Sequence, residues 1–201
     1  NDLRICNEIK GFLIDNNIDY LGGQVLIAMP NMSDPRFSQA VIYICVHNDE
    51  GAMGIVVNHP LDSSDYTNLM EQLEIDVSDS SPKFDMLLGG PVEADRGFVL
   101  HSTDYEQDST MRVNDEIALT GTLDILRAIV NGAGPRDHLV VLGYAGWGPG
   151  QLDDEIRRNG WLHVEADKDL LFYYSPSEKW LKALDKLGID PLMLSDETGH
   201  A

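Results

Sequence analysis

The stretch LVVLGYAGWGPGQLDDEIRR, residues 139–158, decides much of the predicted fold. Its first four residues form an apolar run that is typical of a buried strand. A glycine-dense segment follows, in which we expect a turn. Its glycines are Gly143, Gly146, Gly148 and Gly150. A helix is predicted to begin after Pro149. A strand, a glycine turn and a helix start in this order often hold a functional site, so this stretch is the first candidate.

The chain on the N-terminal side of this stretch predicts strands at residues 24–29, 38–46 and 53–58. The turn at residues 48–51 joins the last two into a hairpin, because Asn, Asp and Gly favour such links. Their apolar runs are nearly continuous rather than alternating, which indicates strands covered on both faces. Shorter strands are predicted at residues 86–88, 98–101, 117–119 and 161–164, with a loop at residues 92–97.

Helices are predicted at residues 66–73 and 120–131, and a last helix has clear end signals. Ser175, Pro176 and Glu178 provide an N-cap, a first helical residue and a capping box, and Gly188 ends the helix. Its expected apolar face is Trp180, Leu181, Leu184 and Leu187. Residues 1–22 predict a helical arm, and residues 23–201 a single domain. Strands interspersed with helices, without regular βαβ alternation, predict an α+β fold with much antiparallel pairing.

The composition is strongly acidic, with 14 Lys and Arg against 34 Asp and Glu and a formal net charge of −20. Such a surface repels nucleic-acid phosphates and anionic lipids, so direct nucleic-acid contact is disfavoured and neutral or cationic partners are favoured. An ordinary well-solvated surface is the preferred explanation of the charge. No apolar run reaches the roughly 18 residues of a membrane span. No signal peptide is visible.

The two cysteines are too few for a disulfide framework, which points to a cytoplasmic protein. Cys45 lies in a predicted strand, and we expect a small buried hydrophobic residue there rather than a catalytic thiol. Cys6 lies in the predicted arm.

Two glycine segments are candidates for ligand binding. The spacing of Gly146, Gly148 and Gly150 departs from the dinucleotide fingerprint, and carboxylates in the following helical turn would repel a phosphate. The Gly89-Gly90 turn exposes backbone N–H groups near Arg96, whose guanidinium suits a carboxylate or phosphate. Arg96 is expected to pair instead with Glu93 or Asp95.

Motifs for metal, cofactor or nucleophilic chemistry are missing from the sequence. The six histidines lack H-x-x-x-H or H-E-x-x-H spacing, no C-x-x-C occurs, and we predict neither a metal nor a cofactor. The G-x-S-x-G elbow and the phosphate-binding P-loop are also absent. His101 and Ser102 are adjacent on a strand and should face opposite sides, so they make a poor catalytic pair.

Five separated motifs together resemble the AlgH/YqgE family of bacterial proteins over residues 23–201. They are LIAMPNMSDPRF, GAMGIVVNHPL, LLGGPVEADRGFVLH, LGYAGWGPGQLDDEI with NGWL, and the closing GHA. The resemblance implies an α+β fold in which a bifurcated, largely antiparallel sheet forms a pseudo-barrel flanked by helices. The family's function is poorly established, and its name reflects a proposed role in regulating alginate gene expression.

The resemblance assigns no catalytic residue, so the nature of the site stays open. The positions that match its motifs are Asn58, Gly89, Gly90, Pro91, Arg96, Gly97, Gly143, Tyr144, Trp147, Gly150 and Gln151. We take seven as candidate ligand-binding residues: Asn58, Gly89, Gly90, Arg96, Tyr144, Trp147 and Gln151.

Three hypotheses follow, in this order of preference. The first is a non-enzymatic regulatory or binding domain that takes a small molecule or a protein partner. The second is an enzyme acting on a small molecule where residues 89–96 and 144–151 meet. The third is a transcriptional regulator, against which the charge counts.

Overall fold

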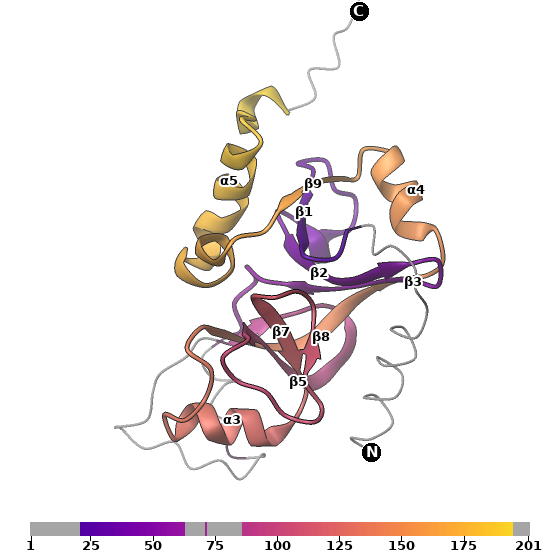
Figure 1. Ribbon diagram of the computed structural model, residues 1–201. Helices are drawn as coiled ribbons and strands as arrows, with labels where there is room; N and C mark the ends of the chain where they lie inside the picture. The colour runs from indigo at the N-terminus through magenta and orange to yellow at the C-terminus, as the bar shows by residue number, and fades with distance from the viewer. Residues whose placement is uncertain (1–20, 63–70, 72–85, 195–201) are drawn as a thin grey trace, which may run out of the picture.

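The computed structural model describes residues 21–62, 71 and 86–194 of the 201-residue chain. A nine-stranded sheet curls into a half-barrel with helices around it (Figure 1). The predicted α+β class and the bifurcated sheet that the family resemblance implied are therefore confirmed. The predicted arm lies almost wholly outside the described residues, as does the predicted helix at residues 66–73 apart from residue 71.

Eight strands form one continuous hydrogen-bonded path across the sheet. In spatial order they are β6 (Met111–Arg112), β7 (Ile117–Thr120), β5 (Val92–Ser102), β8 (His138–Trp147), β3 (Gly51–Val56), β2 (Val41–Asn48), β1 (Gln24–Ala28) and β9 (Trp161–Glu165). The central β2–β3 hairpin follows the predicted pattern, and every pairing along this path is antiparallel.

Strand β8 is where the sheet divides. Its first part pairs antiparallel with β5 and parallel with β4 (Met86–Leu88). Its last three residues, 145–147, pair with β3. Because one long strand serves both halves, β8 holds the two parts of the sheet together and ends at the segment that leads into α4.

The glycine-dense turn predicted at residues 143–150 is shorter than expected, because Gly143 and Gly146 belong to β8. Gly143 has φ +69°, and a Cβ there would lie 2.4 Å from the carbonyl oxygen of Gly90. Glycine is thus required for the close approach of two backbones rather than for a turn. The loop predicted at residues 92–97 is likewise a strand, since Val92 already pairs with Tyr144 and the register shifts before Gly97.

The helices pack on the outside of the sheet (Figure 1). In the part of the chain that the structure describes, they are α3 (Leu123–Val130), α4 (Gln151–Arg157) and α5 (Pro176–Lys186), with short helical turns η1 (Pro35–Phe37), η2 (Asp169–Tyr173) and η3 (Pro191–Met193). The capping box of Ser175 and Glu178 is present as predicted. None of the described helices is both long and apolar enough to cross a membrane.

The predicted apolar face of α5 is only partly right. Leu181 and Leu187 are exposed, whereas Lys179 is buried beside Trp180. The Lys179 Nζ donates hydrogen bonds to the carbonyl oxygens of Val57 and Leu171, which lets a lysine occupy a core position.

Among the described residues, three apolar clusters form the core. The largest lies between the sheet and the segment that contains η2 and α5, and it holds Cys45, which is buried as predicted. The second includes Trp147, Leu152 and Trp161 and lies under α4. The third joins α3 to β5 and β8. The second cluster positions the candidate site.

Candidate functional site

A pocket of about 480 Å³ lies beside α4. Its walls come from four segments that are distant in sequence: residues 31–37, Pro91, the end of β8, and α4 with the start of β9. The lining residues are Asn31, Met32, Ser33, Asp34, Arg36, Phe37, Pro91, Gly146, Trp147, Gln151, Glu155, Arg158, Asn159, Gly160 and Trp161. This volume lies within the range of sites for small molecules.

Two tryptophans converge on one carboxylate in this pocket. The indole Nε1 atoms of Trp147 and Trp161 donate hydrogen bonds to Oε2 of Glu155, at 3.0 Å and 2.8 Å. Gln151 Nε2 donates to the other oxygen, Oε1, at 2.9 Å. The two indole rings meet edge to face with centroids 6.2 Å apart. These contacts fix the Glu155 carboxylate between β8, β9 and α4.

The opposite wall is the turn that leads into η1. Asp34 caps η1 by accepting from the Arg36 backbone N–H, and its carboxylate also accepts two hydrogen bonds from Nε and one from Nη2 of the Arg36 guanidinium. This interaction lowers the pKa of Asp34 and raises that of Arg36. Phe37 packs edge to face on Trp161, with centroids 5.8 Å apart. The turn therefore contributes a closed ion pair and an aromatic ring.

Arginine side chains at the end of α4 differ in their pairing. Arg157 Nη2 lies 2.8 Å from the carboxylate of Asp154, three residues earlier. Arg158 likewise follows Glu155 by three residues, but the Glu155 carboxylate points toward the indoles of Trp147 and Trp161. Among the described residues, no carboxylate lies within ion-pair distance of the Arg158 guanidinium. Arg158 is exposed at the pocket rim.

Of the predicted site residues, the structure places Trp147 and Gln151 in this pocket. The segments at residues 89–96 and 144–151 do meet, and Pro91 of the first lines the pocket with Gly146 of the second. Gly89 and Gly90 instead pack against β8. A Cβ at Gly89 would lie 2.3 Å from the Gly143 carbonyl oxygen, and one at Gly90 would lie 2.1 Å from the carbonyl carbon of Tyr144.

The remaining predicted residues lie outside the pocket. Tyr144 packs edge to face on Phe98, 5.9 Å between centroids. The Arg96 guanidinium lies over the Phe98 ring and 3.7 Å from the carboxylate of Glu93, which agrees with the expected pairing. Buried Asn58 accepts a hydrogen bond from the backbone N–H of Val41 and donates one to the Gln39 carbonyl oxygen. That geometry fixes the start of β2 and gives Asn58 a structural role.

Sequence reasoning missed three lining residues of interest: Glu155, Arg158 and Trp161. In the sequence, Glu155 is one of the carboxylates in the helical turn that follows the glycine segment. The available signal was the pair of tryptophans that flank α4 in sequence, each with an indole N–H that needs an acceptor when buried.

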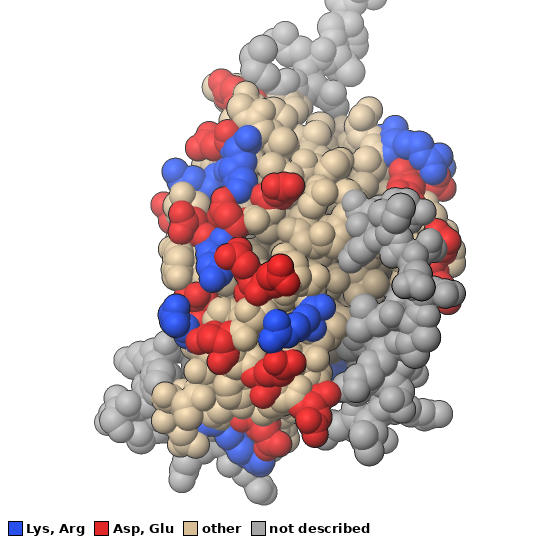
Figure 2. All heavy atoms as spheres, in the orientation of Figure 1, with Lys and Arg blue, Asp and Glu red and all other residues tan. Residues whose placement is uncertain are grey.

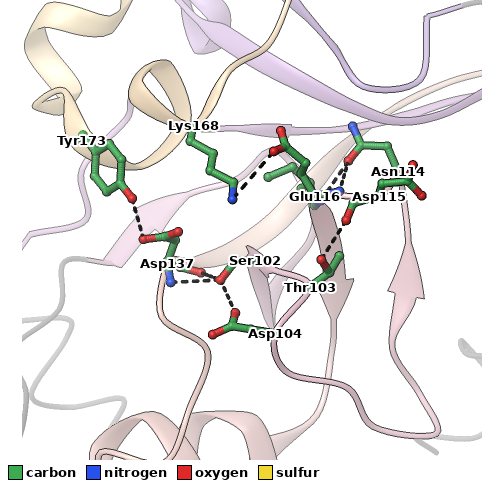
Figure 3. Close-up of polar contacts among 10 residues, drawn as sticks. Ser102, Thr103, Asp104, Asn114, Asp115, Glu116, Asp137, Lys168 and Tyr173 are labelled. Carbon is green, nitrogen blue, oxygen red and sulfur yellow. Dashed lines mark hydrogen bonds and ion pairs between the residues drawn. The ribbon is translucent and has the colours of Figure 1, made fainter.

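A second polar cluster lies where β5 ends and β8 begins, near η2 (Figure 3). Ser102 Oγ donates to Asp104 Oδ1 at 2.5 Å and accepts from the Asp137 backbone N–H. Tyr173 donates its hydroxyl to Asp137 Oδ1 at 2.8 Å. The hydrogen bond from Ser102 is the main cause of a lowered pKa at Asp104, and the hydrogen bond to Asp137 is the main cause of a raised pKa at Tyr173.

His101 and Ser102 are adjacent in this cluster, but their side chains have different hydrogen-bond partners. The His101 ring nitrogens contact the Ser102 carbonyl oxygen and the Thr120 hydroxyl, while the Ser102 hydroxyl turns to aspartates. Burial lowers the His101 pKa, which the contact with the Ser102 carbonyl partly opposes. Their different partners agree with the prediction that they form a poor catalytic pair. In the described part of the chain, no group of three His, Cys, Asp or Glu could hold a metal ion.

Comparison with known proteins now identifies the class. A family model described as AlgH-like matches residues 25–192, so the chain belongs to the AlgH-like family, as the resemblance of the motifs predicted. A UPF0301 protein of Bradyrhizobium diazoefficiens is 54% identical over 190 residues, which cover 90% of this chain and 89% of that protein. A UPF0301 protein of Rhodospirillum rubrum is 48% identical over 189 residues, which cover 94% of this chain and 98% of that protein.

Two solved structures are similar to this one. The solution structure of the AlgH protein from Pseudomonas aeruginosa has a TM-score of 0.70 and 39% identity, covering 93% of this chain and 99% of that chain. A crystal structure of a protein from Corynebacterium diphtheriae has a TM-score of 0.67 at 19% identity. The match covers 92% of this chain and 96% of that chain. The second likeness concerns the fold alone.

Proposed function

We propose that this protein is a non-enzymatic binding domain that holds a small ligand in the pocket beside α4. A regulatory role would follow if the occupied and empty forms bind a partner differently. The buried thiol of Cys45 fits a reducing compartment, and we place the protein in the cytoplasm.

The observation that carries the proposal is the arrangement of the pocket's acidic groups. Asp34 is held by Arg36, and Glu155 accepts from two indoles and Gln151. Carboxylates engaged in this way shape a site and are poorly placed to take a proton from a substrate. The aromatic wall and the fixed polar groups are typical of a preformed binding pocket.

Tryptophan fluorescence provides the test, because two of the three tryptophans line the pocket. The full chain is titrated with a panel of amino acids, organic acids, nucleotides, sugars and polyamines. Trp161→Phe and Trp180→Phe variants serve as a matched pair, since Trp180 belongs to α5, donates to the Ala28 carbonyl oxygen and does not line the pocket.

A saturable signal that Trp180→Phe keeps and Trp161→Phe reduces would support the proposal. Mass spectrometry of the recovered ligand should show it unchanged. Catalytic conversion of the ligand would contradict the proposal and favour an enzyme at the same pocket. A saturable signal that depends on Trp180 and not on Trp161 would place binding elsewhere.

A further inference from the structure

The pocket contains two opposite charges that are held apart. Glu155 and Arg158 are three residues apart at the end of α4, where side chains of opposite charge normally reach each other. Their neighbours Asp154 and Arg157 do so at 2.8 Å. Glu155 does not pair with Arg158, because its carboxylate is fixed by the indoles of Trp147 and Trp161.

Each separated charge keeps capacity for a ligand. A carboxylate accepts about four hydrogen bonds. Glu155 receives three from the described side chains: two on Oε2 and one, from Gln151, on Oε1. Room for one more donor thus remains on Oε1. The Arg158 guanidinium has five N–H donors and no carboxylate partner among the described residues.

The other charges in the pocket do not compete for these positions. Asp34 and Arg36 neutralise one another through three side-chain hydrogen bonds. What remains is the fixed Glu155 carboxylate, which can accept a hydrogen bond from a cation, and the Arg158 guanidinium, which can donate to an anion. The two residues are three apart and so lie on the same side of the helix end. Basic side chains gather over α4 in Figure 2, and Arg157 and Arg158 are its last helical residue and its C-cap.

We propose, on the basis of the binding function above, that the pocket takes a small zwitterion of the free α-amino-acid type. The ligand's ammonium donates to Glu155, and its carboxylate receives the Arg158 guanidinium. The apolar side chain lies toward Phe37, Met32 and Trp161, which form the apolar wall of the pocket. A zwitterion has no net charge, so it escapes the long-range repulsion that the −20 protein exerts on anions.

The pocket volume sets the size of the side chain. At about 480 Å³, the pocket exceeds what glycine or alanine would fill. Burial of apolar surface contributes about 25 cal/mol per Å². A ligand that leaves most of the apolar wall exposed to water therefore gains little binding free energy. We therefore expect L-leucine, L-methionine and L-phenylalanine to bind more tightly than glycine.

The experiment removes one charge at a time from ligand and protein. Calorimetric titrations compare L-leucine with leucinamide, which lacks the carboxylate, and with N-acetyl-leucine, which lacks the ammonium. Each ligand is measured on the wild type, on Arg158→Gln and on Arg157→Gln. The Arg157 variant is the matched control, because that guanidinium pairs with Asp154 and does not line the pocket.

Arg158→Gln should weaken L-leucine binding about 10- to 100-fold, the range of a charge-assisted hydrogen bond. The same variant should leave leucinamide unchanged, and Arg157→Gln should change neither ligand. Both analogues should bind the wild type more weakly than leucine. A purely structural role for Arg158 would not produce this dependence on the ligand's carboxylate.

Three results would overturn the proposal. One is leucinamide binding the wild type as tightly as leucine, and another is equal effects of the two arginine variants. The third is a wild type that binds no amino acid at 10 mM. If the fluorescence panel of organic acids, nucleotides, sugars and polyamines still yields a ligand in that case, the proposed binding function stands and only the proposal of a zwitterionic ligand is wrong. If that panel also fails, both proposals fall.

Discussion

Gly90 shows how closely two strands approach beside the candidate site. It has φ +152°, and a Cβ built on it would lie 2.1 to 2.4 Å from three backbone atoms of Tyr144 and Ala145. Backbone atoms within a sheet cannot move aside as a flexible side chain can. Glycine is therefore required here by both conformation and space.

We expect Gly90→Ala to lower the free energy of unfolding by roughly 3 to 4 kcal/mol, because overpacking adds to backbone strain. The control is Gly132→Ala. Gly132 also has a positive φ, +72°, but a Cβ there would meet nothing within 4 Å. Strain alone should cost about 1 kcal/mol. Urea unfolding of both variants checks the difference, and equal losses would show that the strand contact is unimportant.

The sequence indicated that Gly89 and Gly90 matter, but it could not show for what. A Gly-Gly pair near an arginine is compatible with anion binding and with close packing. The choice depends on which backbone lies opposite, and β8 comes some fifty residues later in the chain. Trp147 and Gln151 could be proposed as site residues because their motif adjoins a predicted helix start, and local sequence carries that signal.

Helix α5 joins the sheet through an unusual buried lysine. Lys179 is 1% exposed, and its ammonium donates to the carbonyl oxygens of Val57 and Leu171. Burial lowers its pKa from 10.5 to about 8. The end signals at Ser175, Pro176 and Gly188, together with helical periodicity, were enough to predict where α5 begins and ends. It could not predict that a lysine faces the core, because two carbonyls from other segments make this possible.

The lowered pKa of Lys179 predicts how stability changes with pH. The charged form is disfavoured in the native state, so below pH 8 folding bears the full cost of burying the charge. Between pH 8 and 10.5 the unfolded chain holds the proton more tightly than the native protein does. Stability should therefore rise with pH in this window, by up to about 3 kcal/mol from this group.

Lys179→Met isolates this contribution, because it keeps the chain length and removes the charge. Urea unfolding of both proteins from pH 7 to 10.5 should show the wild type gaining stability relative to the variant. Other groups that titrate there, such as Tyr173, are present in both proteins and cancel. Parallel pH profiles would mean that Lys179 does not titrate in this range and that its burial costs less than inferred.

On the scale of the whole molecule, a chain built around one curled sheet has 34 acidic and 14 basic residues. On the face in Figure 2, acidic side chains are interspersed with basic ones, and no continuous basic stripe follows the sheet. The excess of acidic over basic residues was already evident from the sequence, because counting charged residues does not require knowledge of the fold. The separation of Glu155 from Arg158 could not be predicted, because it depends on two tryptophans from different strands.

This charge distribution predicts that the protein does not bind DNA directly. DNA affinity comes largely from neutralising phosphates, and a protein of −20 repels them most strongly at low salt, where screening is weakest. The anisotropy of a labelled duplex should stay constant up to about 100 µM protein at 50 mM NaCl. Binding that weakens steeply as salt rises would contradict the prediction and support a direct transcriptional regulator.

The basic end of α4 would then be the first surface to test, and salt separates its two possible roles. Phosphate contacts release counterions, so each lost contact makes the logarithmic salt dependence less steep by about one unit. A zwitterion carries no net charge and releases few ions, so its affinity should change little over the same salt range. Arg158→Gln would flatten the salt dependence if DNA binds there. If the pocket binds an amino acid instead, the variant would weaken binding about equally at every salt concentration.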